Sequence, residues 1–262
     1  MRNALESDLG RISVWTVVAA ATGFAGAALS GILDDLILVF QRQPVPIVMP
    51  EEMMQVLLSG LTSEPVLLTL PVLAALPFTT AFLDDCASRY VHSFLPRSGL
   101  GNYIASKAVV TAISGGGALV LGALTALSMI MILLLPLTSA PAAEESADEL
   151  RIAGQTALVD IMASMLLLFL SGALWSLVGA NLAVLTTSRY AAYAAPFVFF
   201  YLLVILAERY FYGAFMLNPK EWISPSDNWP GDVGGAALFI GELVCIFAVL
   251  YALLMKRRLR HV

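Results

Sequence analysis

The apolar positions along this chain gather into six long runs separated by shorter polar stretches. The runs cover residues 14–33, 66–83, 108–137, 157–180, 190–207 and 236–255. Crossing about 30 Å of hydrocarbon takes roughly 20 helical residues, with about 17 as a lower limit, so each run is long enough to span a bilayer. Because backbone amides in lipid must pair within their own segment, and no alternating pattern of roughly ten residues indicates a membrane barrel, we expect six transmembrane helices.

The composition excludes a water-soluble fold. Side chains of the AVILMFWYC set make up 59% of the 262 residues and charged side chains only 13%, against roughly 45–50% and about 25% in soluble domains. Too few polar groups are present to coat a folded surface in water. The prediction is an all-α integral membrane protein in which residues 1–262 form a single transmembrane domain. The net charge of −5 argues against a nucleic-acid partner.

The basic residues set the expected orientation. An even number of spans places both termini on one side, and most Lys and Arg residues then fall on that side. The residues on the side of the termini are Arg2, Arg11, Arg89, Arg97, Lys107, Arg189, Lys256, Arg257, Arg258 and Arg260, and those on the other side are Arg42, Arg151, Arg209 and Lys220. Because cytoplasmic loops carry the excess of basic residues, both termini are predicted to be cytoplasmic.

The segment before the first apolar run predicts that this run remains on the chain as an anchor. Its two acidic residues, Glu6 and Asp8, are atypical of a secretory signal. Its apolar residues fall near helical spacing at positions 4, 5, 9 and 12. This pattern predicts a short amphipathic helix on the inner membrane surface.

The stretch after the second run, residues 82–107, has a helical pattern and is called the elbow below. Its apolar side is formed by Phe82, Cys86, Tyr90 and Phe94, and its polar side by Asp84, Asp85, Ser88, Arg89 and His92. The second span is therefore predicted to continue into the cytoplasm as an amphipathic helix. Asp85 and Arg89 form an i,i+4 pair on that helix.

The second half of the elbow is predicted to turn the chain back into the membrane. Pro96 ends the helix, residues 97–99 form the turn, and Asn102 or Ser106 caps the next helix. Such an elbow can simply join two spans. Its aromatic, acidic and basic side chains around a proline turn also suit a docking surface for a cytosolic protein.

The order of these features resembles ABC-2 type transporter permeases over nearly the whole chain. The shared features are six spans with internal termini, an acidic elbow with a Pro-Arg-x-Gly turn after the second span, and a Trp/Pro segment before the last. In that family the elbow docks into a groove of the ATPase subunit. By this resemblance the docking residues are Asp84, Asp85, Arg89, Tyr90, Phe94, Pro96, Arg97, Gly99, Tyr103 and Lys107. The family's glycine is replaced by Ala87 or Ser88, and Ser106 precedes Lys107.

The resemblance implies the permease subunit of a bacterial ABC exporter in the cell membrane, without catalytic residues, metal or cofactor of its own. No G-x-x-x-x-G-K-[ST] pattern occurs, and the glycines at 115–117 lie within a span, so ATP and Mg²⁺ would be bound by a partner ATPase. The implied partners are ABC ATPase subunits, a second permease chain as homodimer or heterodimer, and the lipid bilayer.

Small residues predict where helices approach closely. In the first span Gly23, Ala27 and Gly31 share a face at four-residue spacing, which suits packing within the chain or a dimer contact. The fourth span repeats the pattern at Gly172, Ser176 and Ala180. The two cysteines, at 86 and 245, belong to no CxxC or Cys/His cluster and predict neither a disulfide framework nor a zinc site.

Two further features have open interpretations. Glu242 lies about two turns into the last span, where it either lines a translocation path or pairs with Arg209. The residues Tyr210, Tyr212, Trp222 and Trp229 precede that span and predict a re-entrant or interfacial segment. An aromatic belt and a substrate vestibule both account for them.

Two other function classes compete with a transport subunit. The elbow partly matches the metal-binding signature of CDP-alcohol phosphotransferases through Asp84, Asp85, Arg89 and Gly99, but the later aspartates of that signature are missing. A membrane scaffold or an immunity protein without transport activity is the second alternative.

Overall fold

We describe a computed structural model of the chain over residues 2–33, 37, 56, 58–88, 91, 99–134, 147–211, 215–225 and 229–259. The regular structure of these residues is helical. In chain order the elements are α1 (Arg2–Leu9), α2 (Val14–Gly31), α5 (Glu64–Ala75), α6 (Ala81–Ala87), α8 (Leu100–Leu134), α9 (Ala147–Thr186), α10 (Arg189–Arg209), η2 (Phe215–Leu217) and α11 (Asp232–Leu259).

Five of the described helices, α2, α8, α9, α10 and α11, are long and apolar enough to cross a membrane. They correspond to the first, third, fourth, fifth and sixth predicted spans. The helices α8 and α9 have 35 and 40 residues, which is longer than about 30 Å of hydrocarbon requires. The all-helical membrane architecture predicted from the sequence is therefore present in the described part of the chain.

The predicted second span is interrupted instead of forming one continuous helix. The 12-residue helix α5 ends at Ala75, a turn covers residues 76–80, and α6 follows. Pro77 supplies no N–H to continue the helix. The carbonyl groups at the break find hydroxyl partners, because Thr79 Oγ1 donates to Ala75 O and Thr16 Oγ1 donates to Pro77 O at 3.5 Å. With about 18 Å of length, α5 is too short to cross hydrocarbon alone.

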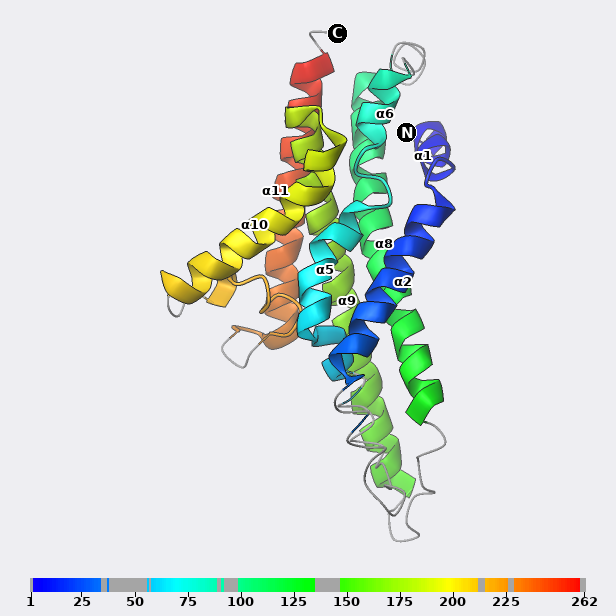
Figure 1. Cartoon of the computed structure of the whole chain (residues 1–262), viewed down its shortest axis with the longest axis vertical. Helices are drawn as coiled ribbons and strands as arrows, with labels where there is room; N and C mark the ends of the chain where they lie inside the picture. Colours follow the sequence, from blue (N-terminus) through cyan, green and yellow to red (C-terminus); the bar gives the residue numbers. More distant parts are fainter. Residues whose placement is uncertain are drawn as a thin grey trace.

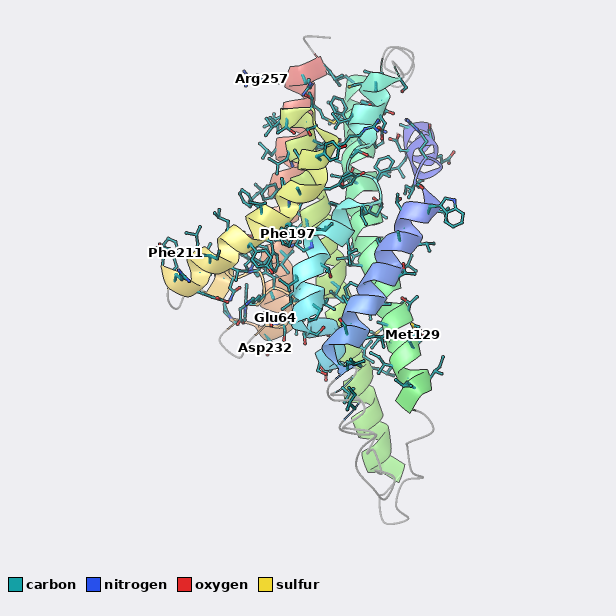
Figure 2. The ribbon with its side chains drawn as sticks, viewed as in Figure 1. Glu64, Met129, Phe197, Phe211, Asp232 and Arg257 are labelled. Carbon is teal, nitrogen blue, oxygen red and sulfur yellow. The ribbon has the colours of Figure 1, made fainter. Side chains whose placement is uncertain are left out.

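Helix α9 lies at the centre of the bundle and contacts α8, α11, α10, α5 and α6. Its Trp175 ring packs edge-on against Phe200 of α10 at 5.4 Å and stacks on Trp222 at 6.1 Å. These three rings are buried. Residues 167–184 of α9 are thus enclosed by the other helices, whereas Leu158, Val159 and Met162 nearer its start are exposed. Helix α10 splays away from the bundle toward the labelled Phe211 (Figure 2).

The helices α8 and α9 cross at glycine residues. A Cβ atom added to Gly172 would lie 2.8 Å from Gly115 O and 2.9 Å from Gly116 Cα. Ser176, one turn further along α9, donates to Thr111 O at 3.0 Å. Gly172 and Ser176 of the packing face predicted in the fourth span therefore lie against α8 of the same chain.

The small residues of α2 face α5. A Cβ atom on Gly23 would lie 2.9 Å from Leu73 Cδ2, and one on Gly31 would overlap Ser63. Ala27 packs against the main apolar core. This stripe therefore serves packing within the chain.

One end of the molecule holds α1, α6 and the C-terminal end of α11 (Figure 1), and it is called the α6 end below. Arg257 of α11 lies at this end and Asp232 at the other (Figure 2). The last turn of α11 is basic, with Lys256, Arg257 and Arg258. The N-terminal helix and the end of the last helix therefore lie at the same end of the molecule.

Candidate functional site

The α6 end contains a group of charged and hydroxyl side chains, all of them buried except Arg11, called the ion cluster below. Its members are Asp8, Arg11, Asp85, Tyr103, Ser106 and Lys107. Lys107 Nζ lies 2.9 Å from Asp8 Oδ1 and 2.8 Å from Asp85 Oδ2. Arg11 Nη1 lies 2.5 Å from Asp85 Oδ1. The side chains of Lys107, Asp8 and Asp85 are only 1%, 3% and 0% exposed.

Three segments bring these groups together. Helix α1 carries Asp8 and packs on α8, so the N-terminal helix predicted from the sequence forms and buries one side against protein. Tyr103, Ser106 and Lys107 are spaced i, i+3 and i+4 on α8 and share one face. Helix α6 begins after the break at residues 76–80, and Asp85 of α6 lies against that face of α8.

Each of the two carboxylates also accepts a hydrogen bond from a hydroxyl group. Ser106 Oγ donates to Asp8 Oδ2 at 2.7 Å, and Tyr103 Oη donates to Asp85 Oδ2 at 2.8 Å. The Lys107 ammonium also lies 4.9 Å from the centroid of the Phe78 ring. Two acids and two bases give a formally neutral cluster, which is what burial of charge in a medium of low dielectric constant requires.

A second ion pair, on the other side of α6, is exposed. Asp84 Oδ1 lies 2.5 Å from Arg189 Nη2, with side chains 42% and 62% exposed. Thr80 Oγ1 donates to Asp84 Oδ2 at 3.3 Å and lies 3.4 Å from Tyr193 Oη. The adjacent residues Asp84 and Asp85 thus point to different helices, toward α10 and toward α1 and α8. They do not form the paired carboxylates that a phosphotransferase site would need, and the described residues contain no group of three or more His, Cys, Asp or Glu placed to hold a metal.

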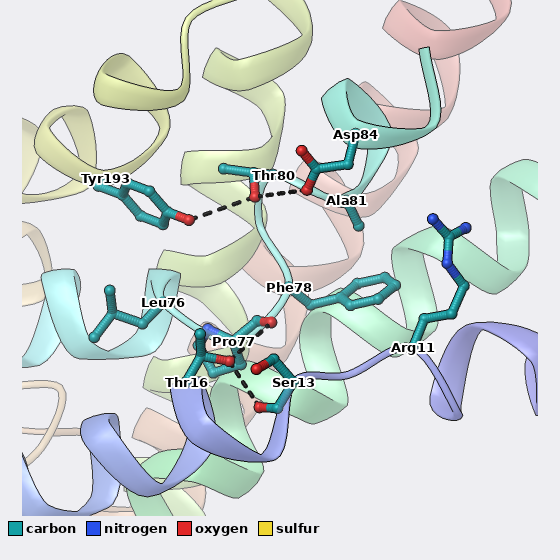
Figure 3. Close-up of a pocket in the computed structure, with 10 residues that line it drawn as sticks. All are labelled: Arg11, Ser13, Thr16, Leu76, Pro77, Phe78, Thr80, Ala81, Asp84 and Tyr193. Atoms are coloured by element: carbon teal, nitrogen blue, oxygen red, sulfur yellow. Dashed lines mark hydrogen bonds between the residues drawn. The ribbon is translucent and has the colours of Figure 1, made fainter. Parts of the chain in front are cut away.

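An open pocket of about 170 Å³ lies beside the break between α5 and α6 (Figure 3). Its polar lining consists of Arg11, Ser13, Thr16, Thr80, Asp84 and Tyr193. The remaining walls are apolar and come mainly from residues 76–78. The pocket therefore joins the starts of α2 and α10 to the break in the second span.

The predicted docking residues fall into three groups. Asp85, Tyr103 and Lys107 are buried in the ion cluster and do not reach the surface. Asp84 and Gly99 are accessible, and Gly99 has φ +76° at the start of α8, a left-handed conformation that favours glycine. The others lie outside the residues that the structure describes, and they are Arg89, Tyr90, Phe94, Pro96 and Arg97.

Sequence reasoning missed half of the ion cluster. It noted Asp8 only as an unusual residue for a signal segment, Arg11 only as a topology marker, and Ser106 only as a possible helix cap. The available signal was an acid within an amphipathic leader, together with Ser106 and Lys107 one helical turn after Tyr103. Nothing in the linear pattern said that α1 packs on α8, so the pairing of Asp8 with Lys107 could not be inferred.

Glu242 lies apart from the ion cluster, on an outward face of α11. It is exposed, as are Leu238, Ile246 and Val249 on the same face. Within the described ranges no ion pair joins Glu242 to Arg209. The carboxyl group therefore projects from an apolar surface of the chain.

The segment before α11 folds into the protein. Trp222 and Trp229 are 5% and 3% exposed, and both pack against Phe239 of α11. The Trp222 indole donates to Met216 O at 2.8 Å. Tyr210, by contrast, is 74% exposed, and Tyr212 lies outside the residues that the structure describes. An aromatic belt thus fits Tyr210, whereas the two tryptophans are part of the core.

The two cysteines allow a test of orientation. Cys86 and Cys245 are both exposed, but Cys245 lies in the apolar helix α11. Partial shielding of the Cys86 thiol raises its pKa, although the positive charge of Arg258 opposes the shift. We expect a membrane-impermeant maleimide to label Cys86 in inside-out vesicles only, and more quickly at about pH 9 than at about pH 7 because the thiolate reacts.

Two variants control this labelling experiment. Cys86→Ser should abolish the label and Cys245→Ser should preserve it, since lipid shields position 245. Labelling of Cys86 in right-side-out vesicles alone would reverse the orientation predicted from the basic residues.

Comparisons with known proteins identify no relative: no family model, no curated protein and no solved structure matches this chain.

Proposed function

We propose that this chain is the transmembrane subunit of an ATP-driven transporter of the ABC-2 type, an exporter in a bacterial cell membrane. Its elbow would dock on a separate ATPase at the cytoplasmic side, which we take to be the α6 end. The observation that supports the proposal best is the ion cluster, because it lies at the base of the elbow. Asp85 precedes the turn of the elbow and Lys107 follows it, and the two are joined at 2.8 Å.

A docking element can transmit motion only if it is firmly attached to the helices that move. The ion pair between Asp85 and Lys107 joins α6 to α8, and Asp8 adds α1 to the same group. Val91 of the elbow is buried and packs with Phe82 and Tyr103. A push on the elbow would therefore displace α1, α6 and the start of α8 together.

The break at residues 76–80 suits the role of a hinge. Hinges are short segments at helix ends that absorb changes in backbone angles. Between α5 and α6 the chain lacks the continuous helical hydrogen bonds that would resist bending. In the proposed mechanism the α6 end moves as a unit and α5 keeps its packing against α2 and α9.

The roles of the predicted docking residues divide accordingly. The buried side chains of Asp85, Tyr103 and Lys107 would support the elbow from within. Contact with the ATPase would fall to the remaining predicted docking residues of the elbow, with Arg97, which follows Pro96 in the sequence, as the proposed anchor. The outward face of α11 around Glu242 would meet a second permease chain, so that this carboxyl lines the path between the two copies.

Association with an ATPase tests the proposal. The tagged full-length chain, purified from its native membrane, is expected to carry an ATP-hydrolysing subunit in stoichiometric amount. Arg97→Ala should weaken this association about tenfold, because a truncated anchor residue commonly costs 1–2 kcal/mol or more of binding energy. Recovery of the subunit and its ATPase activity are measured together.

The matched control is Arg209→Ala, which removes an exposed arginine at the C-terminal end of α10, whereas Arg189 at the other end of that helix pairs with Asp84 of α6. It should leave the association unchanged. Purification without any nucleotide-hydrolysing companion would contradict the proposal and favour a scaffold or immunity protein.

A further inference from the structure

We propose that the pocket beside the break between α5 and α6 binds the headgroup of an aminophospholipid from the surrounding bilayer. The chemistry recognised is a phosphate joined through two carbons to a primary ammonium group. This inference concerns a site that transport does not require, and it stands whether or not an ATPase binds the elbow.

Two exposed aromatic residues indicate at which level of the bilayer the pocket lies. Trp15 is 83% exposed and Tyr190 is 88% exposed. They lie in the first turns of α2 and α10, and both helices also contribute to the pocket through Thr16 and Tyr193. Exposed tryptophan and tyrosine rings at helix ends favour the headgroup layer of a bilayer. The pocket therefore lies where phospholipid headgroups are present.

The lining offers one partner for each charge of such a headgroup. Arg11 and Asp84 both line the pocket (Figure 3), and their side chains are 35% and 42% exposed. A guanidinium group suits a phosphate, because its N–H donors match the phosphate oxygens. The Asp84 carboxylate can accept hydrogen bonds from a primary ammonium.

The hydroxyl groups around Asp84 also suit an ammonium ligand. Thr80 donates to Asp84 at 3.3 Å and lies 3.4 Å from the Tyr193 hydroxyl. Both distances are long for O–H···O hydrogen bonds, which are commonly about 2.7–2.8 Å. An ammonium group between these oxygens would replace weak contacts by charge-assisted hydrogen bonds.

The charge of the site favours a neutral, zwitterionic ligand. Arg11 is balanced by Asp85, and Asp84 is balanced by Arg189, each at 2.5 Å. A phosphate with an ammonium group leaves this balance unchanged. An anionic headgroup without the amine would add one negative charge and offer no ammonium group to Asp84.

The size of the pocket limits the ligand further. Its volume of about 170 Å³ equals that of about six water molecules, which accommodates the ammonium, the two carbons and part of the phosphate. The acyl chains would continue along the apolar surface of α2, where Val14 and Val18 are exposed. A trimethylated ammonium is bulkier and has no N–H to donate to Asp84.

Lipid competition tests this site. The full-length chain in detergent is mixed with equal amounts of phosphatidylethanolamine, phosphatidylcholine and phosphatidylglycerol of the same acyl chains, and retained lipid is counted by native mass spectrometry. We expect phosphatidylethanolamine to be retained about tenfold over each of the others. Asp84→Asn should remove this preference. The matched control is Glu208→Gln, because Glu208 is also a half-exposed carboxylate in an ion pair, 3.0 Å from Lys220, and it should keep the preference.

A second variant keeps the test independent of the Asp84–Arg189 pair. Ala81→Leu places a larger side chain at the pocket wall and should also abolish the selective retention of phosphatidylethanolamine. Without lipid, this variant should have the same melting temperature as the parent chain. Equal retention of phosphatidylcholine, a preference for phosphatidylglycerol, or full retention by both variants would overturn the proposal. The last measurement replaces the lipid by soluble glycerophosphoethanolamine, which has the headgroup but no acyl chains. If it binds as tightly as the intact lipid, the pocket binds a soluble molecule instead of a bilayer lipid.

Discussion

Replacing Lys107 with methionine is expected to lower the free energy of unfolding by about 3–5 kcal/mol, because it leaves two buried carboxylates with one cation between them. In the parent chain Lys107 lies within 3 Å of both Asp8 and Asp85. Methionine keeps most of the side-chain volume, so the loss reports on charge. The measurement is unfolding by a denaturing detergent, followed through the fluorescence of the buried tryptophans.

Two further variants make the result specific to the ion cluster. Lys107→Met combined with Asp8→Asn restores equal numbers of acids and bases and should recover more than half of the lost stability. Arg189→Met breaks the exposed pair with Asp84 and should cost less than about 1 kcal/mol. Equal losses for Lys107→Met and Arg189→Met would show that the cluster is solvated in the folded protein.

The second large effect is expected at the crossing of α8 and α9. Gly172→Ala should destabilise the protein by about 2 kcal/mol, because the added methyl group meets backbone atoms and cannot turn away from them. The two atoms are Gly115 O and Gly116 Cα, at 2.8 Å and 2.9 Å. The helices would have to separate along the whole contact, including the Ser176 to Thr111 hydrogen bond.

Gly117→Ala is the matched control for this prediction. It lies one residue beyond Gly116 on α8, and a Cβ atom there meets nothing within 4 Å. Since alanine favours helix over glycine by about 0.5–1 kcal/mol, Gly117→Ala should leave stability unchanged or slightly increased. A comparable loss in both variants would contradict close packing at Gly172. The same detergent titration measures both.

The helices and their packing faces were largely predictable because their signals are local. Apolar runs of sufficient length predicted α2, α8, α9, α10 and α11, and the structure has all five. Small residues at helical spacing predicted close contacts, and Gly23 and Gly172 lie in such contacts. Run length and periodicity are properties of consecutive residues, so a single sequence contains them.

The break in the second span was not predicted, although its cause is visible. Pro71 and Pro77 lie in the same apolar run, yet only Pro77 coincides with a break, since α5 includes Pro71. At the break the carbonyl group of Pro77 accepts a hydrogen bond from Thr16, which another helix supplies.

From its sequence alone this chain is a helical membrane protein with a polar elbow after the second apolar run. Hydrophobic length and charge distribution determine that result, because burial in lipid acts on each segment separately. Only the tertiary structure decided that Asp85 and Lys107 lie inside the protein, with Asp8 beside them and Asp84 turned toward a pocket. The physical reason is that a charge in the interior depends on an opposite charge within about 3 Å, and in a folded chain such neighbours come from segments far apart in the sequence.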